Sequence, residues 1–248
     1  MSSLGKLLKE RKTLCGINVS LACPETLEII SDAGFDWAFI DYEHSAFDLA
    51  DIRLILQLFK NKLFSVVRLP DQSETNIKKI LDLGADGIII PQIRSAEEVR
   101  KVLQYSKYPP QGARSVGLYR AQDYGKNFDS YISTANENVA VIALIEHIDA
   151  VNDIDNICSV PGLSAIYLGP YDLSASLGVT GKINDEKVVS AIEIVRKSAL
   201  KHNLSLGIFT QDPKKVPELF ETGYNFLTCG VDLVLFANAI SQIASQLK

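Results

Sequence analysis

The sequence lacks the features that direct a chain into a membrane or an oxidising compartment. Its longest apolar run, Val139 to Ile145, has seven residues, far fewer than a membrane-spanning helix requires. Its four cysteines show neither C-x-x-C spacing nor an evident pairing, which indicates reduced thiols. Near the N-terminus, Leu4, Leu7 and Leu8 form a helical stripe between lysines rather than a signal-peptide core. We therefore expect a cytoplasmic protein without a membrane segment.

The sequence also lacks a strongly basic segment and a glycine-rich phosphate loop. It has 25 Lys and Arg against 30 Asp and Glu, a net charge of −5, which argues against nucleic acid as a partner. No G-x-G-x-x-G follows any apolar run, so a dinucleotide-binding fold is disfavoured. Hydrophobic residues make up 47% and charged residues 22% of the chain, the composition of an ordinary globular protein rather than a disordered one.

Apolar runs rich in β-branched residues recur along the whole chain, and segments of helical spacing separate them. Because runs such as Val139–Ile145 are apolar throughout, they suit a sheet buried on both faces, which is a parallel sheet. Eight strand–helix units in 248 residues predict an α/β fold in which residues 1–248 form one (β/α)8 TIM barrel; a doubly wound open sheet is the alternative. The predicted strands are Thr13–Leu21, Trp37–His44, Leu63–Pro70, Asp86–Gln92, Val139–His147, Leu163–Pro170, Leu204–Thr210 and Asn225–Asp232.

Two further segments bear on assembly. Pro109 to Asn138 contains no clear strand, and a loop of this length in a compact domain is usually functional or held by a partner. The last segment, from Phe236 to Leu247, carries an apolar helical stripe. We expect a short N-terminal helix and a C-terminal helix, the latter used in contacts between subunits of a homo-oligomer, in which Arg120 could reach a neighbour's pocket.

Polar residues follow several predicted strands, where a barrel of this kind places its active site. Two of them, Glu146 and Asp172, are carboxylates that suit Mg²⁺ or Mn²⁺ better than zinc. His44 could move a proton, because free imidazole titrates near neutral pH. Arg68 could stabilise an enolate oxygen. Each residue also has a structural alternative: Arg68 could pair with Asp41 or Glu43, and Glu146 could cap a helix.

From about Gly16 to Leu247 the sequence resembles the HpcH/HpaI family of class II aldolases, which act on 4-hydroxy-2-oxo acids. The resemblance rests on several motifs in the order and spacing typical of the family. They are Ala33-Gly34-Phe35-Asp36-Trp37, Ile40-Asp41-Tyr42-Glu43-His44, Val67-Arg68-Leu69-Pro70, Leu81-Asp82-Leu83-Gly84, Tyr108-Pro109-Pro110-Gln111-Gly112-Ala113-Arg114, Ile145-Glu146 and, most specific, Leu168-Gly169-Pro170-Tyr171-Asp172-Leu173-Ser174-Ala175-Ser176-Leu177-Gly178.

The resemblance implies a role for each matching residue. His44 is the expected catalytic base, Arg68 the enolate-stabilising group, and Glu146 and Asp172 the ligands of a divalent cation (Mg²⁺, Mn²⁺ or Co²⁺). The turn formed by Gly169, Pro170, Tyr171 and Asp172 is expected to receive the pyruvate carboxylate. The family's assembly implies a hexamer.

Asp82 matches an aspartate that raises the basicity of the histidine, but it precedes a strand and therefore belongs to the opposite end of the barrel. It either acts across a subunit interface or is structural, with Asp41 orienting His44 instead. Two positions depart from the family: Leu144 replaces a glutamine that touches the bound keto acid, and Asn18 replaces a common tryptophan. The pocket is therefore expected to have an apolar floor and a more polar acceptor side.

The leading hypothesis is a metal-dependent aldolase that cleaves or forms 4-hydroxy-2-oxo acids through a pyruvate enolate, with a 2-oxo acid and an aldehyde as its small-molecule partners. A decarboxylase of an oxaloacetate-type 2-oxo dicarboxylate, or an enol-type synthase, would use the same residues. A barrel that binds a metabolite without turnover is the third possibility, and Leu144 is the feature that favours it.

Overall fold

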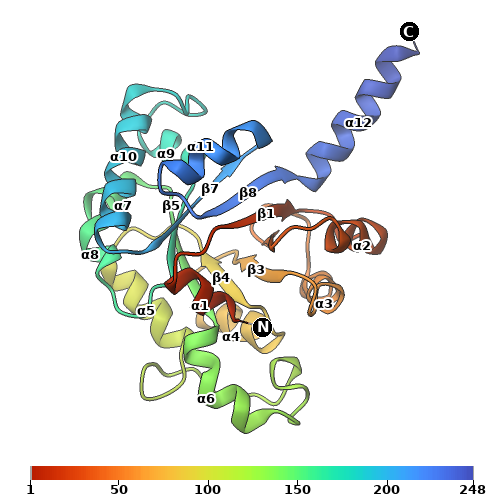
Figure 1. Ribbon diagram of the computed structural model, residues 1–248. Helices are drawn as coiled ribbons and strands as arrows, with labels where there is room; N and C mark the ends of the chain where they lie inside the picture. The colour runs from red at the N-terminus through yellow and green to blue at the C-terminus, as the bar shows by residue number, and fades with distance from the viewer. Residues whose placement is uncertain (1, 248) are drawn as a thin grey trace.

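The computed structural model describes residues 2–247. Eight parallel strands form a closed barrel in the order β1 to β8, and helices surround it (Figure 1). The predicted (β/α)8 barrel is therefore confirmed, with strands slightly shorter than expected. They are β1 Leu14–Val19, β2 Trp37–Asp41, β3 Phe64–Arg68, β4 Gly87–Ile90, β5 Ala140–Ile145, β6 Ala165–Leu168, β7 Ser205–Thr210 and β8 Phe226–Val231.

Most helices follow the strands and cover the outside of the barrel, whereas α1 precedes β1 and α12 extends away from the barrel (Figure 1). The helices are α1 Leu4–Lys9, α2 Pro24–Asp32, α3 Leu49–Leu58, α4 Glu74–Asp82, α5 Ala96–Ser106, α6 Phe128–Asn138, α7 Ile148–Asn152, α8 Ile154–Cys158, α9 Pro170–Ser176, α10 Glu186–Lys201, α11 Val216–Glu221 and α12 Asp232–Gln246, with short 3₁₀ turns at Arg120–Gln122 and Pro213–Lys215. Within residues 2–247, none of these helices is long and apolar enough to cross a membrane.

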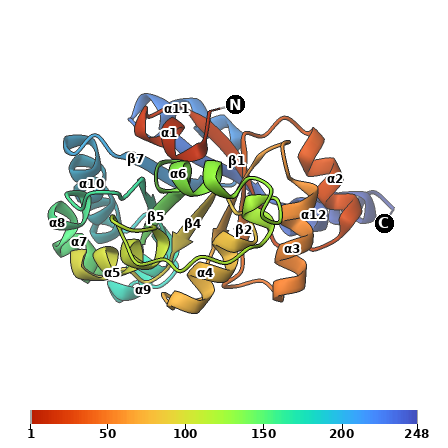
Figure 2. The same cartoon turned by 90° about the horizontal axis from the view of Figure 1, so that it is seen from below.

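Side chains fill the inside of the barrel and close its amino end. Trp37 stacks on Phe226 with ring centroids 3.9 Å apart, and the Tyr167 hydroxyl lies 2.6 Å from Thr228 Oγ1. Leu4 and Leu8 of α1 belong to the same buried cluster. The N-terminal helix therefore plugs the amino end (Figure 2), which leaves the carboxyl end available for a site.

The segment from 109 to 138 is not the continuous loop that the sequence suggested. It contains no strand in the described part of the chain, as expected, but α6 occupies residues 128–138. Ala135 is buried, and the buried Lys107 ammonium donates to the carbonyls of Asn136 and Val139 at 2.7 and 2.8 Å. Tertiary contacts thus form a helix from residues with weak intrinsic helix propensity.

The C-terminal helix α12 departs from the barrel instead of covering it (Figure 1). Its first residue, Asp232, is fastened to the end of β1 by hydrogen bonds from the Ser20 and Leu21 backbone amides, each 3.0 Å long. Beyond this anchor the helix is exposed. Its large apolar side chains Leu235, Phe236, Ile240 and Ile243 are 51%, 59%, 51% and 63% exposed.

Candidate active site

Two hollows meet at the carboxyl end of the barrel, where the expected active site lies. Their volumes are ≈ 270 and ≈ 280 Å³, and both are lined by His44, Glu146 and Asp172. The first hollow also contains Arg68 and Gly169–Tyr171, and the second contains Glu43, Gln92 and Arg94. The strand ends thus bring together four of the predicted residues, namely His44, Arg68, Glu146 and Asp172.

Arg68 is held in a fixed orientation by acids at the end of the neighbouring strand. Its Nε and Nη2 donate to the two carboxylate oxygens of Asp41 at 2.9 and 2.6 Å, a geometry that matches the planar guanidinium. Its Nη1 lies 3.3 Å from Glu43 Oε2. Because these side chains are mostly buried, the guanidinium is presented to the hollow with little freedom to move. The structural pairing considered for Arg68 is therefore present, and it serves to position the charge.

Glu146 follows β5 and is buried against backbone on two sides. Its Oε1 accepts a 2.7 Å hydrogen bond from the backbone amide of Gln92, and Gln92 has a left-handed backbone with φ of 54°. On the other side lies Gly169, where an added Cβ would stand 2.9 Å from Glu146 Cβ and 3.1 Å from Oε2. The backbone thus fixes this carboxylate. Glu146 does not cap the following helix α7, because the backbone amide of Asp149 in its first turn donates to His147 Nδ1 instead.

Negative charge accumulates around Glu146. Burial, together with the charges of Glu43 and Asp172, raises the pKa of Glu146 to about 7. Burial also raises the pKa of Glu43, although Arg68 and His44 oppose the shift. A carboxylate that resists ionisation beside two other acids has the electrostatics of a cation site.

His44, Tyr171 and Asp172 form the open rim of the site. The His44 side chain is 64% exposed, and its Nε2 lies 3.9 Å from Glu43 Oε2. Asp172 belongs to the first turn of α9 and is exposed. Among the described hydrogen bonds and ion pairs none joins Asp41 to the His44 ring: Asp41 Oδ1 accepts from the His44 backbone amide at 3.1 Å and from Arg68 Nε at 2.9 Å. Asp41 therefore fixes the turn that carries the histidine rather than the histidine's tautomer.

Asp82 lies away from these residues, at the end of α4. Its Oδ1 accepts a 2.7 Å hydrogen bond from Arg114, whose side chain is fully buried with its guanidinium carbon 4.6 Å from the Tyr108 ring centroid. Asp82 lines a separate hollow of ≈ 360 Å³ that it shares with Leu49, Arg53 and Tyr119. Within one chain it does not meet His44.

The expectation for Arg120 is wrong. Its guanidinium donates to the carbonyls of Leu83 and Leu56 at 2.6 and 2.5 Å, and the residue is only 8% exposed. These bonds satisfy the arginine inside its own chain, so it does not reach into a neighbour's pocket.

The floor of the first hollow is apolar, as expected from Leu144. Leu144 is 2% exposed and lines the hollow together with Phe39, Tyr167 and Phe209. Asn18 lines the same hollow from β1, and its Oδ1 is buried without a hydrogen-bond partner among the described residues. The two departures from the family thus lie in one pocket.

Two contributors to the site were not identified from sequence. The sequence indicates Glu43 only as a partner for Arg68, yet its charge also contributes to the raised pKa of Glu146, and its Oε2 lies 3.9 Å from His44 Nε2. The place of Glu43 beside His44 in the Asp-Tyr-Glu-His run is the signal that the sequence offers. The Gln92 amide, by contrast, depends on a left-handed backbone held by two 3.1 Å hydrogen bonds from Gln72 Nε2 to the carbonyls of Pro91 and Gln92. No side-chain pattern indicates it.

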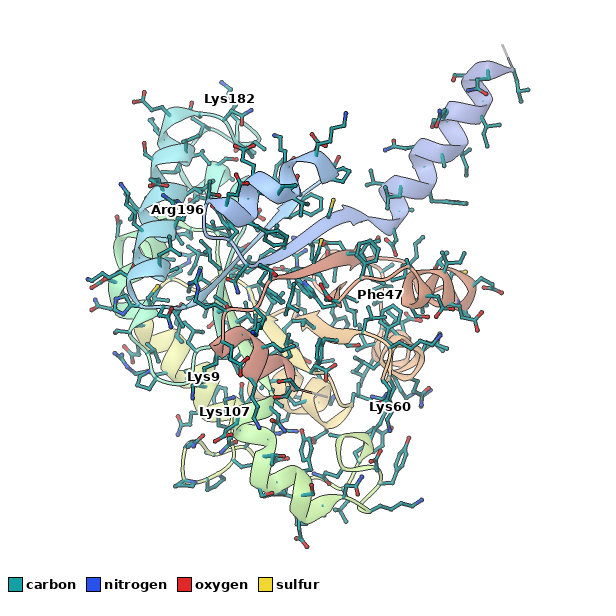
Figure 3. The ribbon with its side chains drawn as sticks, viewed as in Figure 1. Lys9, Phe47, Lys60, Lys107, Lys182 and Arg196 are labelled. Carbon is teal, nitrogen blue, oxygen red and sulfur yellow. The ribbon has the colours of Figure 1, made fainter. Side chains whose placement is uncertain are left out.

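A larger hollow of ≈ 700 Å³ lies at the opposite end of the barrel, between α1 and α6. Lys9 and Lys107 are among its lining residues (Figure 3). The Lys107 ammonium is already bonded to two carbonyls, and burial lowers its pKa to about 8. It therefore serves the packing of α6, and the reactive groups gather at the carboxyl end.

Comparison with known proteins agrees with this geometry. The chain is 32% identical over 244 residues to a hydroxypyruvate/pyruvate aldolase of Cupriavidus necator, an alignment that covers 97% of this chain and 90% of the relative. A solved HpcH/HpaI aldolase/citrate lyase family protein from Burkholderia cenocepacia superposes with a TM-score of 0.94 at 30% identity, over 100% of this chain and 99% of the other. A solved citrate synthase superposes with a TM-score of 0.89 at 28% identity, over 98% and 97% of the two chains.

The expected resemblance is thereby confirmed, and so is the expectation of an aldolase-type enzyme, because the relatives matched over nearly the whole chain include aldolases. The family profile described as HpcH/HpaI aldolase/citrate lyase matches residues 15–239. The chain belongs to the HpcH/HpaI aldolase/citrate lyase family.

Proposed function

We propose that this protein is a divalent-metal-dependent aldolase that cleaves or forms 4-hydroxy-2-oxo acids through a pyruvate enolate. The observation that carries the proposal is the gathering of Arg68, His44, Glu146 and Asp172 around one hollow at the carboxyl end of the barrel. This set combines a fixed cation, a proton acceptor and two oxygen donors. Metal-assisted enolate chemistry uses these three elements.

The residues present fit a bound divalent cation. Glu146 and Asp172 are hard oxygen donors. Burial, followed by the charges of Glu43 and Asp172, raises the pKa of Glu146, and a bound cation would offset this cost of ionising the carboxylate. Residues 2–247 contain no cluster of three or more His, Cys, Asp or Glu able to hold a metal, so waters and substrate would complete the shell, as is usual for Mg²⁺ or Mn²⁺. When bound, such a cation polarises the keto group and stabilises the enolate.

The remaining groups of the chain bind the substrate and move its proton. The turn from Gly169 to Asp172 receives the carboxylate of the 2-oxo acid. Arg68 supports the oxygen on which enolate charge develops, with its orientation preset by Asp41. His44 accepts the proton of the substrate's C4 hydroxyl during cleavage, and returns it during synthesis.

We further propose that the active enzyme is a homo-oligomer, with a hexamer as the assembly that the family resemblance implies. The support is α12, which exposes the side chains of Phe236, Ile240 and Ile243. In a complete (β/α)8 barrel the last helix packs on the outside of the strands, whereas here α12 extends away from them (Figure 1). Cys15 and Cys229 on the outer face of β1 and β8 stay partly exposed. Each copy thus offers an unpacked helix and an incompletely covered barrel, so a second copy of the chain is the complementary occupant. Asp82 would then act on His44 across an interface.

The proposal is tested by measuring pyruvate release from a panel of 4-hydroxy-2-oxo acids, with chelator and with added Mg²⁺, Mn²⁺ or Co²⁺. We expect pyruvate and an aldehyde in equal amounts, only with metal present. Turnover that persists in chelator excludes the metal, and the absence of turnover for every acid favours a binding barrel.

A decarboxylase or enol-type synthase is a second candidate because a solved citrate synthase shares the fold over nearly the full length. Both reactions would pass through the same enolate. Release of carbon dioxide from oxaloacetate without aldehyde would identify the decarboxylase, and condensation of an enolate with a 2-oxo acid would identify the synthase.

A further inference from the structure

The large hollow at the amino end of the barrel takes no part in the proposed reaction. Its volume is ≈ 700 Å³, against ≈ 270 and ≈ 280 Å³ for the two hollows of the active site, and it falls within the size range of small-molecule sites. Helix α1 lines one side and the end of α6 another, while the segments that precede β6 and β7 complete the wall. The hollow therefore has room for a small organic molecule.

A buried ammonium group borders this hollow. Lys107 is among its lining residues and is only 5% exposed. Its Nζ donates to the carbonyls of Asn136 and Val139 at 2.7 and 2.8 Å. A lysine ammonium has three N–H groups, and the third has no acceptor within residues 2–247. The packing of α6 thus uses two donors and leaves one for another partner.

The same ammonium has no carboxylate beside it. No ion pair of the described chain includes Lys107, and the charge that acts on it is that of Arg114, which is also positive. Burial, followed by the charge of Arg114, lowers the pKa of Lys107 to about 8, so the group is still charged at neutral pH. Arg114, by contrast, is fully buried and paired with the Asp82 carboxylate at 2.7 Å. Buried charges are normally paired in this way, so the neighbourhood of Lys107 favours a negative group.

Two further lysines line the hollow from α1. Lys6 and Lys9 are three positions apart on this helix, so their side chains leave it from the same flank. Figure 3 places Lys9 and Lys107 near each other, where α1 passes α6. The positive charges therefore come from two elements that face the same space.

The acidic residues of the lining do not cancel these charges. Glu10 and Glu137 also line the hollow, but both are exposed, and water screens an exposed charge far more than the interior screens a buried one. Three lysines against two glutamates leave the lining with a formal charge of +1, in a chain whose net charge is −5. The hollow thus suits an anion better than a cation.

We propose that this hollow is a binding site, separate from the active site, for a small molecule that carries at least two negative charges, as a phosphate monoester or a dicarboxylate does. One anionic group accepts from the free N–H of Lys107, and the other lies against Lys6 and Lys9. Ser164 adds a neutral donor, because its Oγ accepts from the Val141 amide at 3.1 Å and none of the described hydrogen bonds uses its O–H. The ligand joins α1, which plugs the barrel, to the end of α6. This inference does not depend on the proposed aldolase function.

The test is calorimetric titration of the whole protein, in chelator and at near-physiological salt. The probes are glycerol 3-phosphate, succinate and, as a monoanion, acetate. We expect at least one dianion to bind with a Kd of about 1 mM or lower, and acetate to bind about tenfold or more weakly. Preference for glycerol 3-phosphate assigns the site to phosphate monoesters, and preference for succinate assigns it to dicarboxylates; either supports the proposal. No binding of either dianion overturns it.

Two double variants with the same loss of charge locate the bound dianion. Lys6→Gln combined with Lys9→Gln should raise the Kd about tenfold or more. Lys182→Gln combined with Lys187→Gln is the control: both lysines are exposed, and Figure 3 shows Lys182 far from Lys107. An unchanged Kd in the first variant, or an equal loss in both, overturns the proposal.

Lys107→Met removes the buried charge and should abolish binding. Because Lys107 holds the end of α6, thermal unfolding must first show that this variant is folded. If it is not, the pair of double variants decides the question. Binding by a folded Lys107→Met protein with the wild-type Kd contradicts the role of the buried ammonium and overturns the proposal.

Discussion

At the scale of single residues, the sequence predicts the reactive groups better than their surroundings. Arg68, Glu146 and Asp172 are polar residues after apolar strands, and this pattern alone places them at one end of a parallel barrel. The Gln92 amide and the unpaired Asn18 oxygen are set by backbone torsion and by a shift of register. Such features depend on the assembled barrel, and no spacing of residue types expresses them.

Gly169 is predicted to be required for the position of Glu146. In Gly169→Ala the new methyl group would lie 2.9 Å from Glu146 Cβ, so the carboxylate must move. Gly169 has a φ of −110°, which residues other than glycine also adopt, so we expect Gly169→Ala to fold. Its Mn²⁺ affinity, measured by calorimetry, should fall about tenfold or more, because about 1.4 kcal/mol of strain at Glu146 changes a binding constant tenfold. Gly117→Ala, where the new group would stand 3.1 Å from Asp82 Oδ2 and does not touch Glu146, is the control. Equal Mn²⁺ binding in both variants would contradict the assignment of Glu146.

The pKa of Glu146, raised mainly by burial to about 7, predicts a pH-dependent effect on stability. An unfolded glutamate titrates near 4.3, so ionising Glu146 costs the folded state progressively more as the pH rises from about 4 to about 7, and the full cost applies above that range. Without metal, Glu146→Gln should therefore raise the free energy of unfolding by about 1–3 kcal/mol at pH 8 and far less at pH 4.5.

Urea unfolding in chelator at the two pH values measures this effect. Glu221→Gln, at an exposed position, serves as the control and should change stability at neither pH. A stabilisation by Glu146→Gln that is the same at pH 4.5 and pH 8 would show that the charge of Glu146 is not the cause.

At the scale of secondary structure, strands were predicted more faithfully than helices. All eight strands lie within a few residues of their predicted bounds, because a strand buried on both faces needs a continuous apolar run. Helix α6 was not predicted: its sequence is rich in Ser, Thr and Asn, and it forms where Lys107 binds its last carbonyls. A helix that depends on a distant side chain leaves little trace in local periodicity.

The pairing of β2 with β3 predicts that charge alone cannot replace Arg68. Asp41 and Arg68 are register partners, and the two-bond fork between them fits a guanidinium but not an ammonium. We expect Arg68→Lys to fold and to lose about 10²–10³ in kcat, the usual cost of removing one preorganised charge donor. Steady-state kinetics measure this loss, with the exposed Arg100→Lys as the control. Near-native kcat in Arg68→Lys would make Arg68 a structural residue.

At the scale of the whole molecule, α12 is the element that a single chain leaves unfinished. A helix of 15 residues without packing is marginal in water, and its stripe of Phe236, Ile240 and Ile243 is exposed. We predict that Phe236→Asp combined with Ile240→Asp shifts the protein from oligomer to monomer in sedimentation velocity, because a charge buried at an apolar interface is costly. Asn238→Asp, on another face of α12, should leave the assembly intact. An unchanged assembly in the double variant would show that the stripe is not an interface.

The role of Asp82 can be decided only in the assembly, because it and His44 line separate hollows of one chain. If Asp82 completes the site of a neighbouring copy, then His44→Ala and Asp82→Asn inactivate different parts of a shared site. Mixing the two inactive proteins under conditions of subunit exchange should create some sites with both residues intact, and activity should return to a fraction of the wild-type value. Arg114 pairs with Asp82 at 2.7 Å, so thermal unfolding of each variant must first show that its fold is retained. If exchange is verified by mass spectrometry and activity stays absent, Asp82 is structural through Arg114, and Glu43, 3.9 Å from His44 Nε2, becomes the carboxylate that acts on the base.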